Sequence, residues 1–407
     1  RFTGAGVDPL EAGRTLGVAA VLDGHVQVDK DRLRLTARLL DVRDGRSLWS
    51  GRFNEPLGDF FAIQESIASQ VVRALSVELS DEQRSRLARR DTVDPEAWQL
   101  YLNGRYHWDR KTEEGFLRSI EFYEASAKRD PAFALPHVGL ADALAVLGVF
   151  DMRPPAAVFP PSRLAAQRAV ELDDRLAEAH ASLGHVAVQF DRNWREGERL
   201  YRVALELRPS YAQAVMWLAN NHLVQGRIPE ALSEARHAQL LEPMSLTFAA
   251  NVGLVLSYTG RLDAAYRQLI GLHEAAPQSA LVRHHLARVH IFRGEPAEAI
   301  RLLEGFKARA PQGLSNLGRA YALAGRTEDA RVEIARLHDL GRQGLGVGNY
   351  LALIHAALGE REPALAALEL GLEDHSQQMG FLNLDPGIEI LRDEPRFRAV
   401  MEQVGLA

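Results

Sequence analysis

Beyond residue 95, apolar and small residues recur at three- and four-residue steps in short segments that end at proline. The segments LSEARHAQLLEP (232–243) and AIRLLEGFKARAP (299–311) are clear examples. A period near 3.6 residues predicts amphipathic helices, and proline marks their ends because it cannot continue a helix. We therefore expect this part of the chain to consist of many short helices.

The first 80 residues have a different pattern, in which apolar and polar residues alternate. Three segments alternate in this way, residues 18–28, 31–42 and 46–53, and Arg43-Asp44-Gly45 between the last two is a hairpin signal. Residues 59–79 then return to helical spacing. The pattern predicts a small β-sheet backed by a helix.

A repeat of 34 residues runs through the helical part of the chain. Prolines, glycines and alanines each return at this interval in a constant phase, which is typical of repeat architectures. The recurring residues are Pro209, Pro243, Pro277 and Pro311, then Gly226, Gly260 and Gly294, and finally Ala231, Ala265 and Ala299. After a linker that is three residues short, the phase resumes at Gly325 and Gly359, with Ala330 and Ala364 five residues after each glycine.

Each unit is predicted to be a pair of helices. The glycine can adopt the positive φ that ends the first helix, the alanine lets the two helices approach closely, and the proline ends the second helix. In these residues and their phase, the sequence resembles the tetratricopeptide repeat (TPR) family. The resemblance implies a solenoid of helix pairs with a concave inner face.

Insertions enlarge the repeats that lie upstream of this regular stretch. Pro131 and Pro209 are 78 residues apart, which is two periods plus ten residues, and a proline-rich interruption at 152–161 and a longer turn at 191–194 account for the excess. With a further unit that ends at Pro131, we expect about eight repeats over residues 95–378. Residues 379–407 break the period, and we expect them to cap the last apolar face of the solenoid.

The amino-terminal part resembles another known domain. DPLEAGRTLGVAAVLDGHV (8–26), LLDVRDGRSLWS (39–50) and FAIQESIA (61–68) are similar to the second half of the α/β domain related to the amino-terminal domain of TolB. The resemblance implies a partial α/β domain over residues 1–80, which lacks its opening strand and helix, followed by a charged linker at 81–94. The predicted fold class is therefore mainly α, a TPR solenoid preceded by a small partial α/β domain.

Composition and charge limit the classes of function. The 407 residues are 46% hydrophobic and 25% charged, as in soluble globular proteins, and the net charge of −6 disfavours nucleic acid as a partner. The absence of cysteine excludes disulfides, thiolate nucleophiles and Cys-ligated zinc, and leaves the side of the membrane open. The longest apolar run, 143–150, is far too short to span a bilayer, so no membrane insertion is expected. Because the chain begins with Arg1, we expect it to be part of a longer protein.

Catalytic signatures are absent from the sequence. It contains no G-x-x-x-x-G-K-[ST], no H-E-x-x-H and no G-x-S-x-G motif. Gly344, Gly346 and Gly348 suggest a phosphate-binding loop, but no strand is predicted before them. Pairs of histidines spaced by five residues, such as His285 and His290, do not share a helix face well. We expect no catalytic residue, no metal and no cofactor.

The candidate binding residues lie on the first helix of each repeat. If the recurring glycine is position 15, positions 2, 5, 6, 9, 12 and 13 form the stripe that TPR arrays place on the concave face. The candidates in this stripe are Gln213, Trp217, Asn220, Asn251, Tyr258, His284, His285, Arg288, Asn316 and Arg319. Amides pair with a peptide backbone and aromatic rings accept side chains, so the stripe suits a peptide segment or partner protein. The alternative is that positions 12 and 13 are inter-repeat core and the asparagines are merely solvated.

The predicted ligand is an internal segment. In the TPR subfamily that grips carboxyl-terminal peptides, three cations and two asparagines clamp the terminal carboxylates. Here Asn220 and Asn251 occupy the amide positions, whereas Met216, Leu281 and His285 stand where the cations are required. We therefore expect a mildly acidic internal segment as the ligand.

The expected role is a non-enzymatic interaction module. By resemblance, it would serve a bacterial signalling or transcriptional regulator whose output is a winged-helix DNA-binding domain, a serine/threonine kinase or a nucleotide cyclase. The alternative is the regulatory half of an enzyme whose catalytic domain lies upstream of Arg1.

Overall fold

A computed structural model provides the fold. It describes residues 8–29, 32–56, 70–71, 92–304 and 310–406. The chain divides into two compact units, residues 1–95 and 96–407. Most of the helix predicted at 59–79, and most of the linker predicted at 81–94, lie outside the described residues.

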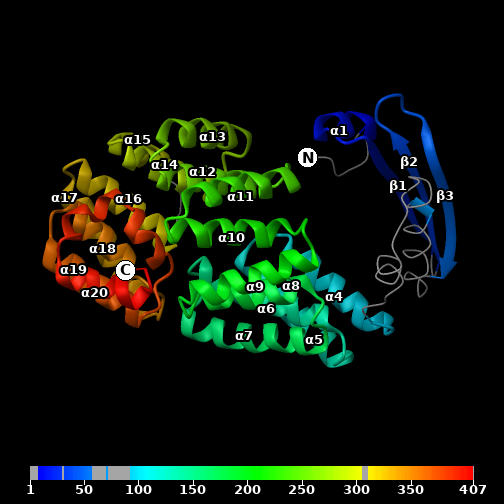
Figure 1. Cartoon of the computed structure of the whole chain (residues 1–407), viewed down its shortest axis with the longest axis horizontal. Coiled ribbons are helices and arrows are strands. Elements are labelled where there is room, and N and C mark those ends of the chain that lie inside the picture. The colour runs from blue at the N-terminus through cyan, green and yellow to red at the C-terminus, as the bar shows by residue number, and fades with distance from the viewer. Residues whose placement is uncertain (1–7, 30–31, 57–69, 72–91, 305–309, 407) are drawn as a thin grey trace. The chain divides into compact units, whose positions relative to one another are not determined.

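The first unit contains a helix and a three-stranded antiparallel sheet in the order β1-β2-β3 (Figure 1). The elements are α1 (Pro9–Leu16), β1 (Ala20–Asp29), β2 (Arg32–Asp41) and β3 (Ser47–Pro56). The turn between β2 and β3 places Gly45 at φ 72°, and its amide donates to the Asp41 carbonyl at 2.9 Å. The three predicted strands and their hairpin are confirmed.

Helix α1 was not predicted from the sequence. The Asp8 side chain accepts a hydrogen bond from the Leu10 amide, and Gly17 ends the helix in the left-handed region at φ 66°. These are the standard start and stop signals of a short helix. The helix packs against β1, where Ala12 is buried.

In the second unit, the described residues between Pro95 and Glu373 form eight consecutive helix pairs (Figure 1). The pairs are α4 (Pro95–Trp108) with α5 (Glu113–Arg129), α6 (Ala134–Val149) with α7 (Pro155–Leu172), α8 (Ala177–Gln189) with α9 (Trp194–Leu207), α10 (Ala212–Val224) with α11 (Ile228–Leu241), α12 (Leu246–Tyr258) with α13 (Leu262–Ala275), α14 (Ala280–Phe292) with α15 (Pro296–Leu303), α16 (Pro311–Leu323) with α17 (Thr327–Arg342), and α18 (Gly348–Ala357) with α19 (Arg361–Glu373). The predicted solenoid fold is confirmed.

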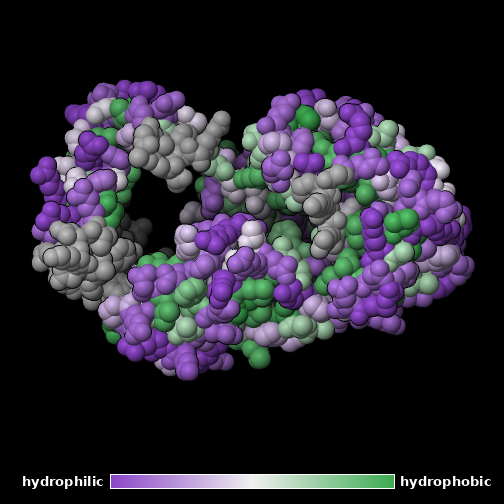
Figure 2. All heavy atoms as spheres, turned by 180° about the vertical axis from the view of Figure 1, so that it is seen from behind, coloured by the Kyte–Doolittle hydropathy of each residue, from purple (hydrophilic) through white to green (hydrophobic). Residues whose placement is uncertain are grey.

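The recurring glycines and alanines have the expected conformation and packing. The turn glycines Gly226, Gly260, Gly294, Gly325 and Gly359 have φ between 71° and 78°. The recurring alanines are all 0% exposed: Ala231, Ala265, Ala299, Ala330 and Ala364. A larger side chain at these alanines would push the two helices of the unit apart. On the face of the helical unit that Figure 2 shows, hydrophilic residues cover much of the surface, with hydrophobic residues in smaller patches among them.

The proline-rich stretch at 152–161 is not the interruption that the sequence predicts. Helix α7 begins at Pro155 and includes Pro160 and Pro161. Proline at the first helical position costs nothing, because that amide has no partner within the helix. Farther along, Phe159 is 0% exposed, and its burial offsets the backbone hydrogen bonds lost at the two later prolines. The inserted residues therefore lengthen the helix.

The carboxyl-terminal part returns toward earlier repeats. It contains two 3₁₀ turns, η2 (Met379–Leu384) and η3 (Pro386–Leu391), and α20 (Pro395–Val404), which packs against α19. The indole Nε1 of Trp194, on α9, donates to the Val404 carbonyl at 2.7 Å. Arg192 donates to the Gly371 carbonyl at 2.9 Å. The last repeat and the tail thus contact the third repeat directly.

Candidate functional site

The ten candidate residues lie on the first helices of repeats four to seven, whose inner surface we call the groove. Gln213, Trp217 and Asn220 are on α10, Asn251 and Tyr258 on α12, His284, His285 and Arg288 on α14, and Asn316 and Arg319 on α16. Six of them line two cavities: Trp217 and Asn220 one, and Tyr258, Arg288, Asn316 and Arg319 the other. The remaining four, Gln213, Asn251, His284 and His285, do not line these cavities.

Polar contacts link the candidate residues from repeat to repeat. Asn251 Nδ2 donates to Asn220 Oδ1 at 2.9 Å. Asn316 Nδ2 donates to the His284 carbonyl at 3.3 Å. Both amides therefore join neighbouring first helices and help to hold the curvature of the groove, and Asn316 also lines one of its cavities.

Burial removes the positive charge of the groove histidines. Burial lowers the pKa of His284 to about 4 and the pKa of His285 well below its usual value, and the Arg288 guanidinium lowers both further. Arg288 Nη1 lies 3.3 Å from His285 Nδ1, which accepts only when the ring is neutral. At neutral pH, the charge that these helices bring to the groove is therefore that of Arg288 and Arg319.

Aromatic contacts complete the two ends of the groove. The His185 ring stacks on Trp217 at 4.1 Å between centroids, and burial lowers the pKa of His185 to about 3, so it stacks as a neutral ring. At the other end, the Arg288 guanidinium lies 5.1 Å from the centre of the Tyr258 ring. The sequence stripe did not include His185, because it belongs to the repeat before the regular phase begins.

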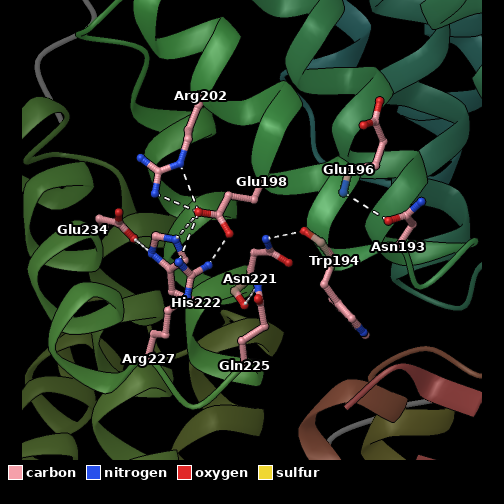
Figure 3. Close-up of polar contacts among 10 residues, drawn as sticks. All are labelled: Asn193, Trp194, Glu196, Glu198, Arg202, Asn221, His222, Gln225, Arg227 and Glu234. Atoms are coloured by element: carbon pink, nitrogen blue, oxygen red, sulfur yellow. Dashed lines mark hydrogen bonds and ion pairs between the residues drawn. The ribbon is translucent and has the colours of Figure 1, made fainter. Parts of the chain in front are cut away.

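An ion-pair network on the side of α10 orients this helix (Figure 3). Glu198 on α9 accepts from Arg202 at 2.7 Å and pairs with Arg227. His222, buried within α10, lies 2.7 Å from Glu234 and 3.4 Å from Glu198. These contacts tie repeat three to repeat four, so they position the helix that carries Trp217 and Asn220.

A segment of the chain itself occupies the groove. We call residues 378–387 the groove segment. The Phe381 ring stacks on Tyr258 at 5.2 Å, and Asp385 accepts two hydrogen bonds from Arg319, at 2.6 and 2.8 Å. The two cavities between this segment and the groove helices measure only ≈ 40 and ≈ 20 Å³. Each has room for about one to three water molecules, so the groove is filled.

Sequence reasoning missed the residues that complete the site. Phe381 and Asp385 lie in the stretch assigned to a cap, and Asn349 and Tyr350 on α18 line the cavity beside Arg319. The repeat phase would have identified Asn349 and Tyr350, since they occupy positions 5 and 6 of repeat eight. For Phe381 and Asp385, the only signal is an aromatic and an acidic residue where the period breaks.

The glycine-rich loop at 344–348 holds a carboxylate of the chain. The amides of Val347 and Gly348 donate to Asp374 Oδ2 at 2.7 and 3.0 Å. These donors at the start of α18 are therefore paired within the protein.

In the part of the chain that the structure describes, no cluster of three His, Asp or Glu side chains is arranged for a metal. No helix there combines the length and apolar character needed to cross a bilayer.

Three segments, residues 212–237, 280–304 and 311–336, match the family model of the tetratricopeptide repeat. The chain contains tetratricopeptide repeats. They lie in repeats four, six and seven of the array, which contribute α10, α14 and α16 to the groove. Repeats of this family imply a protein–protein interaction module, and their fold is typically a non-catalytic scaffold.

Comparison with known proteins gives one curated relative and several structures of similar fold. A protein of Rhizobium meliloti (strain 1021) named "Putative adenylate cyclase 3" is 30% identical over 140 residues, which are 34% of this chain and 24% of the relative. The match thus spans about a quarter of the relative. The human IFIT1 dimer with m7Gppp-AAAA has a TM-score of 0.51 at 16% identity over 86% of this chain and 76% of IFIT1. A TPR protein of Parabacteroides merdae has a TM-score of 0.45 at 11% identity, over 66% of this chain and 99% of that protein. These two structures are similar in fold alone.

Proposed function

We propose that the chain is a non-enzymatic interaction module that binds an internal, mildly acidic segment of a partner protein in the groove. The observation that carries this proposal is the groove segment. The groove holds a peptide segment of the chain itself by an aromatic contact and a bidentate arginine–carboxylate pair. Such a surface has the chemistry to hold a similar segment of another protein.

The polar residues of the groove support a ligand that lacks a free carboxyl terminus. His285 is neutral, and Met216 and Leu281 carry no charge, so the cations of a terminal-carboxylate clamp are missing. Arg288 and Arg319 remain as positive groups and favour an acidic side chain. Asn220 lines one cavity and Asn316 the other, where an amide can pair with a peptide backbone.

In this proposal, the chain itself has no catalytic residue, cofactor or metal, does not bind nucleic acid directly and does not insert into a membrane. The net charge of −6 would repel a phosphate backbone. The buried histidines and carboxylates of the groove serve packing and hydrogen bonding. No nucleophile paired with a base is found at readable spacing in the sequence.

The Rhizobium relative suggests where such a module is used. We propose that the chain senses or scaffolds partners for a bacterial signalling or transcriptional regulator. A second candidate, favoured by that relative's name, is the regulatory part of a nucleotide cyclase. Incubation of the purified chain with Mg·ATP tests whether the chain itself is catalytic. Both candidates expect that no cyclic AMP forms, and its formation would contradict both.

A peptide selection tests the binding proposal. A phage-displayed library of random peptides is selected on the full chain and, separately, on its Phe381→Ala variant, in which the groove segment is weakened. The selected peptides are expected to lose binding to the Asn220→Ala chain and to keep it with Asn103→Ala, a matched change on α4 outside the groove. Peptides that bind both variants equally, or the lack of any binder in both selections, would contradict the proposal.

A further inference from the structure

We propose that the groove segment is an internal ligand that closes the groove, and that the partner which displaces it carries an aromatic side chain followed four residues later by a carboxylate. The inference rests on the proposed binding function and specifies the chemistry of the partner. It follows from two side chains of the segment, Phe381 and Asp385, and from how the groove receives each of them.

The aromatic anchor enters a pocket of rings and one cation. Phe381 stacks on Tyr258 with an interplanar angle of 29°. Tyr258 also meets the edge of Phe292 at 5.7 Å and lies 5.1 Å from the Arg288 guanidinium. An aromatic side chain gains both apolar burial and ring–ring attraction here, whereas an aliphatic side chain gains only the burial. The pocket therefore selects an aromatic ring.

The acidic anchor forms a buried pair. Arg319 and Asp385 keep only 5% and 4% of their side chains exposed, and they are joined in bidentate geometry. A buried guanidinium requires an anionic partner, because an unpaired buried charge is strongly unfavourable. The Arg319 guanidinium also lies 5.4 Å from the centre of the Phe292 ring, so Phe292 contacts both Arg319 and Tyr258, the residues that receive the two anchors. A neutral amide at this point would leave the charge of Arg319 uncompensated.

Two glycines let the segment press against the groove walls. A Cβ atom at Gly380 would lie 2.6 Å from Cη2 of Trp194, and one at Gly387 would overlap the Arg319 guanidinium. Side chains at these positions would lift the segment from the groove. The backbone is therefore in close contact with Trp194 just before Phe381 and with Arg319 just after Asp385. These two contacts set the spacing of the anchors.

The segment is held both by its anchors in the groove and by buried apolar residues of its own. The segment consists of short 3₁₀ turns, which have weaker hydrogen bonds than an α-helix. Phe381 remains partly exposed, so it is the part of the segment that a competing side chain can replace first. Met379 and Leu382 are each 2% exposed and belong to a hydrophobic core that includes residues of repeats six to eight, so they hold the segment to the chain. Because the segment is tethered, it competes at a high effective concentration. The apparent Kd of a partner is then its intrinsic Kd divided by the fraction of time that the groove is open.

The first experiment measures binding of the segment in trans. The probe is a fluorescent synthetic peptide with the sequence of residues 376–391, SQQMGFLNLDPGIEIL. The proteins are the wild-type full chain, an opened variant with Phe381→Ala and Asp385→Asn, and a control variant with Glu389→Gln, which changes an exposed carboxylate of η3. The opened variant is expected to bind the peptide at least about tenfold more tightly than the wild-type and control chains, since its own segment competes less.

Altered peptides test the two anchors. Versions of the peptide with Phe381→Ala or with Asp385→Asn should each bind the opened variant about tenfold or more weakly, whereas the Glu389→Gln version should bind like the unchanged peptide. Equal binding of the unchanged peptide to wild-type and opened chains would overturn the proposal, as would no binding to either. A chain that instead dimerises by exchanging segments would show that the groove takes a second copy, which also contradicts it.

Hydrogen exchange on the wild-type chain keeps the proposal testable if the opened variant does not fold. Amides of residues 378–387 should exchange by local opening, at least about tenfold faster than those of α18 and α19. Exchange of the segment only at the rate of the surrounding helices would make it a fixed part of the core and would overturn the proposal. The library selection distinguishes this inference from the binding function. If the selected peptides depend on the groove but lack the aromatic–carboxylate spacing, this inference is wrong and the proposed binding function is still supported.

Discussion

The hydroxyl of Tyr350 on α18 donates a hydrogen bond to Asp151 Oδ2 at 2.7 Å, although the two residues are 199 positions apart. Asp151 lies in the turn between α6 and α7, at φ 52°, so the bond connects repeat eight to repeat two. With the Trp194–Val404 bond, it closes the array on itself. The helices that line the groove lie between these closing contacts, which therefore help to hold the groove's curvature.

The Asp151 contact predicts that stability declines as the pH rises from about 4 to about 8. Burial, opposed by the Tyr350 hydrogen bond and reinforced by the Asp374 charge, raises the pKa of Asp151 from 3.8 to about 8. The folded protein then holds a proton that the unfolded chain has lost, so the contribution is complete below pH 4 and declines as the pH rises through about 8. We expect urea denaturation at pH 5, 7 and 9 to show this decline.

The Asp151→Asn variant tests the cause. Asparagine keeps an acceptor for Tyr350 and tolerates the left-handed backbone, but it does not titrate. Between pH 5 and 9, the free energy of unfolding of this variant should decline much less than that of the wild-type chain. Tyr350→Phe, which removes the hydroxyl and leaves Asp151 buried, should retain the decline. A decline of unchanged size in Asp151→Asn would assign the effect to another group.

Glu198 predicts a dependence in the opposite direction, at acid pH. The hydrogen bond from Arg227, with smaller contributions from Arg202 and His222, lowers the pKa of Glu198 to about 2. Its contribution is present above pH 4.5, the ordinary value, and is lost as the pH falls toward 2. The Glu198→Gln variant should be less stable at pH 7 and should lose less stability on acidification to pH 3. Circular dichroism melts of both chains at the two pH values measure the difference.

The repeat units could be predicted because their determinants are local. Gly226 and Ala231 are five residues apart and act within one helix pair, so their phase in the sequence directly indicates the turn and the close contact. The same holds for Gly45 in the hairpin of the first unit. At residues 152–161, the local signal of several prolines predicted an interruption of the helix. The burial of Phe159 in the tertiary structure favours a helix there instead.

The occupied groove could not be predicted from such signals. Asp385 meets Arg319 across 66 residues, and Phe381 meets Tyr258 across an even longer span. These contacts depend on the small rotation between successive repeats, which accumulates over the array before the tail can return. Helical spacing placed His284 and His285 on the concave stripe, but their burial, and hence their loss of charge, depends on the neighbouring repeats.

The Ala265→Leu variant tests the packing of the recurring alanine. Ala265 is fully buried between α12 and α13, and a leucine there should overpack the contact at a cost of about 1–3 kcal/mol. Because each repeat is stabilised by its neighbours, hydrogen exchange should become faster in repeats four, five and six. Ala297→Leu, a change at an exposed alanine of α15, is the matched control and should leave exchange unaltered. Unchanged exchange in all three repeats of Ala265→Leu would mean that the site has room for the larger side chain.

Substitutions at Asn220 and Asn251 can distinguish a role of these asparagines in binding from a role in stability. Because Asn251 Nδ2 donates to Asn220 Oδ1, Asn220→Ala alone leaves the buried Asn251 without this partner and should destabilise the fold by about 1–3 kcal/mol. Removing both amides leaves neither group orphaned, so the double variant should be closer to wild type in stability than the sum of the single changes. Denaturation of the four chains in a double-mutant cycle measures this coupling.

Binding should respond differently from stability to the same double change. If the amides hold the ligand backbone, then in the opened chain Asn220→Ala with Asn251→Ala should weaken binding of the 376–391 peptide by about 1–3 kcal/mol, the scale for unpaired peptide groups. Asn103→Ala should not affect it. Amidation of the peptide's carboxyl terminus should change affinity little, because Met216, Leu281 and neutral His285 provide no clamp for a terminal carboxylate. Calorimetric titration of the free-acid and amidated peptides checks both expectations. A double variant that binds as tightly as its parent would limit the asparagines to packing, and a strong loss on amidation would show that the groove reads a chain end after all.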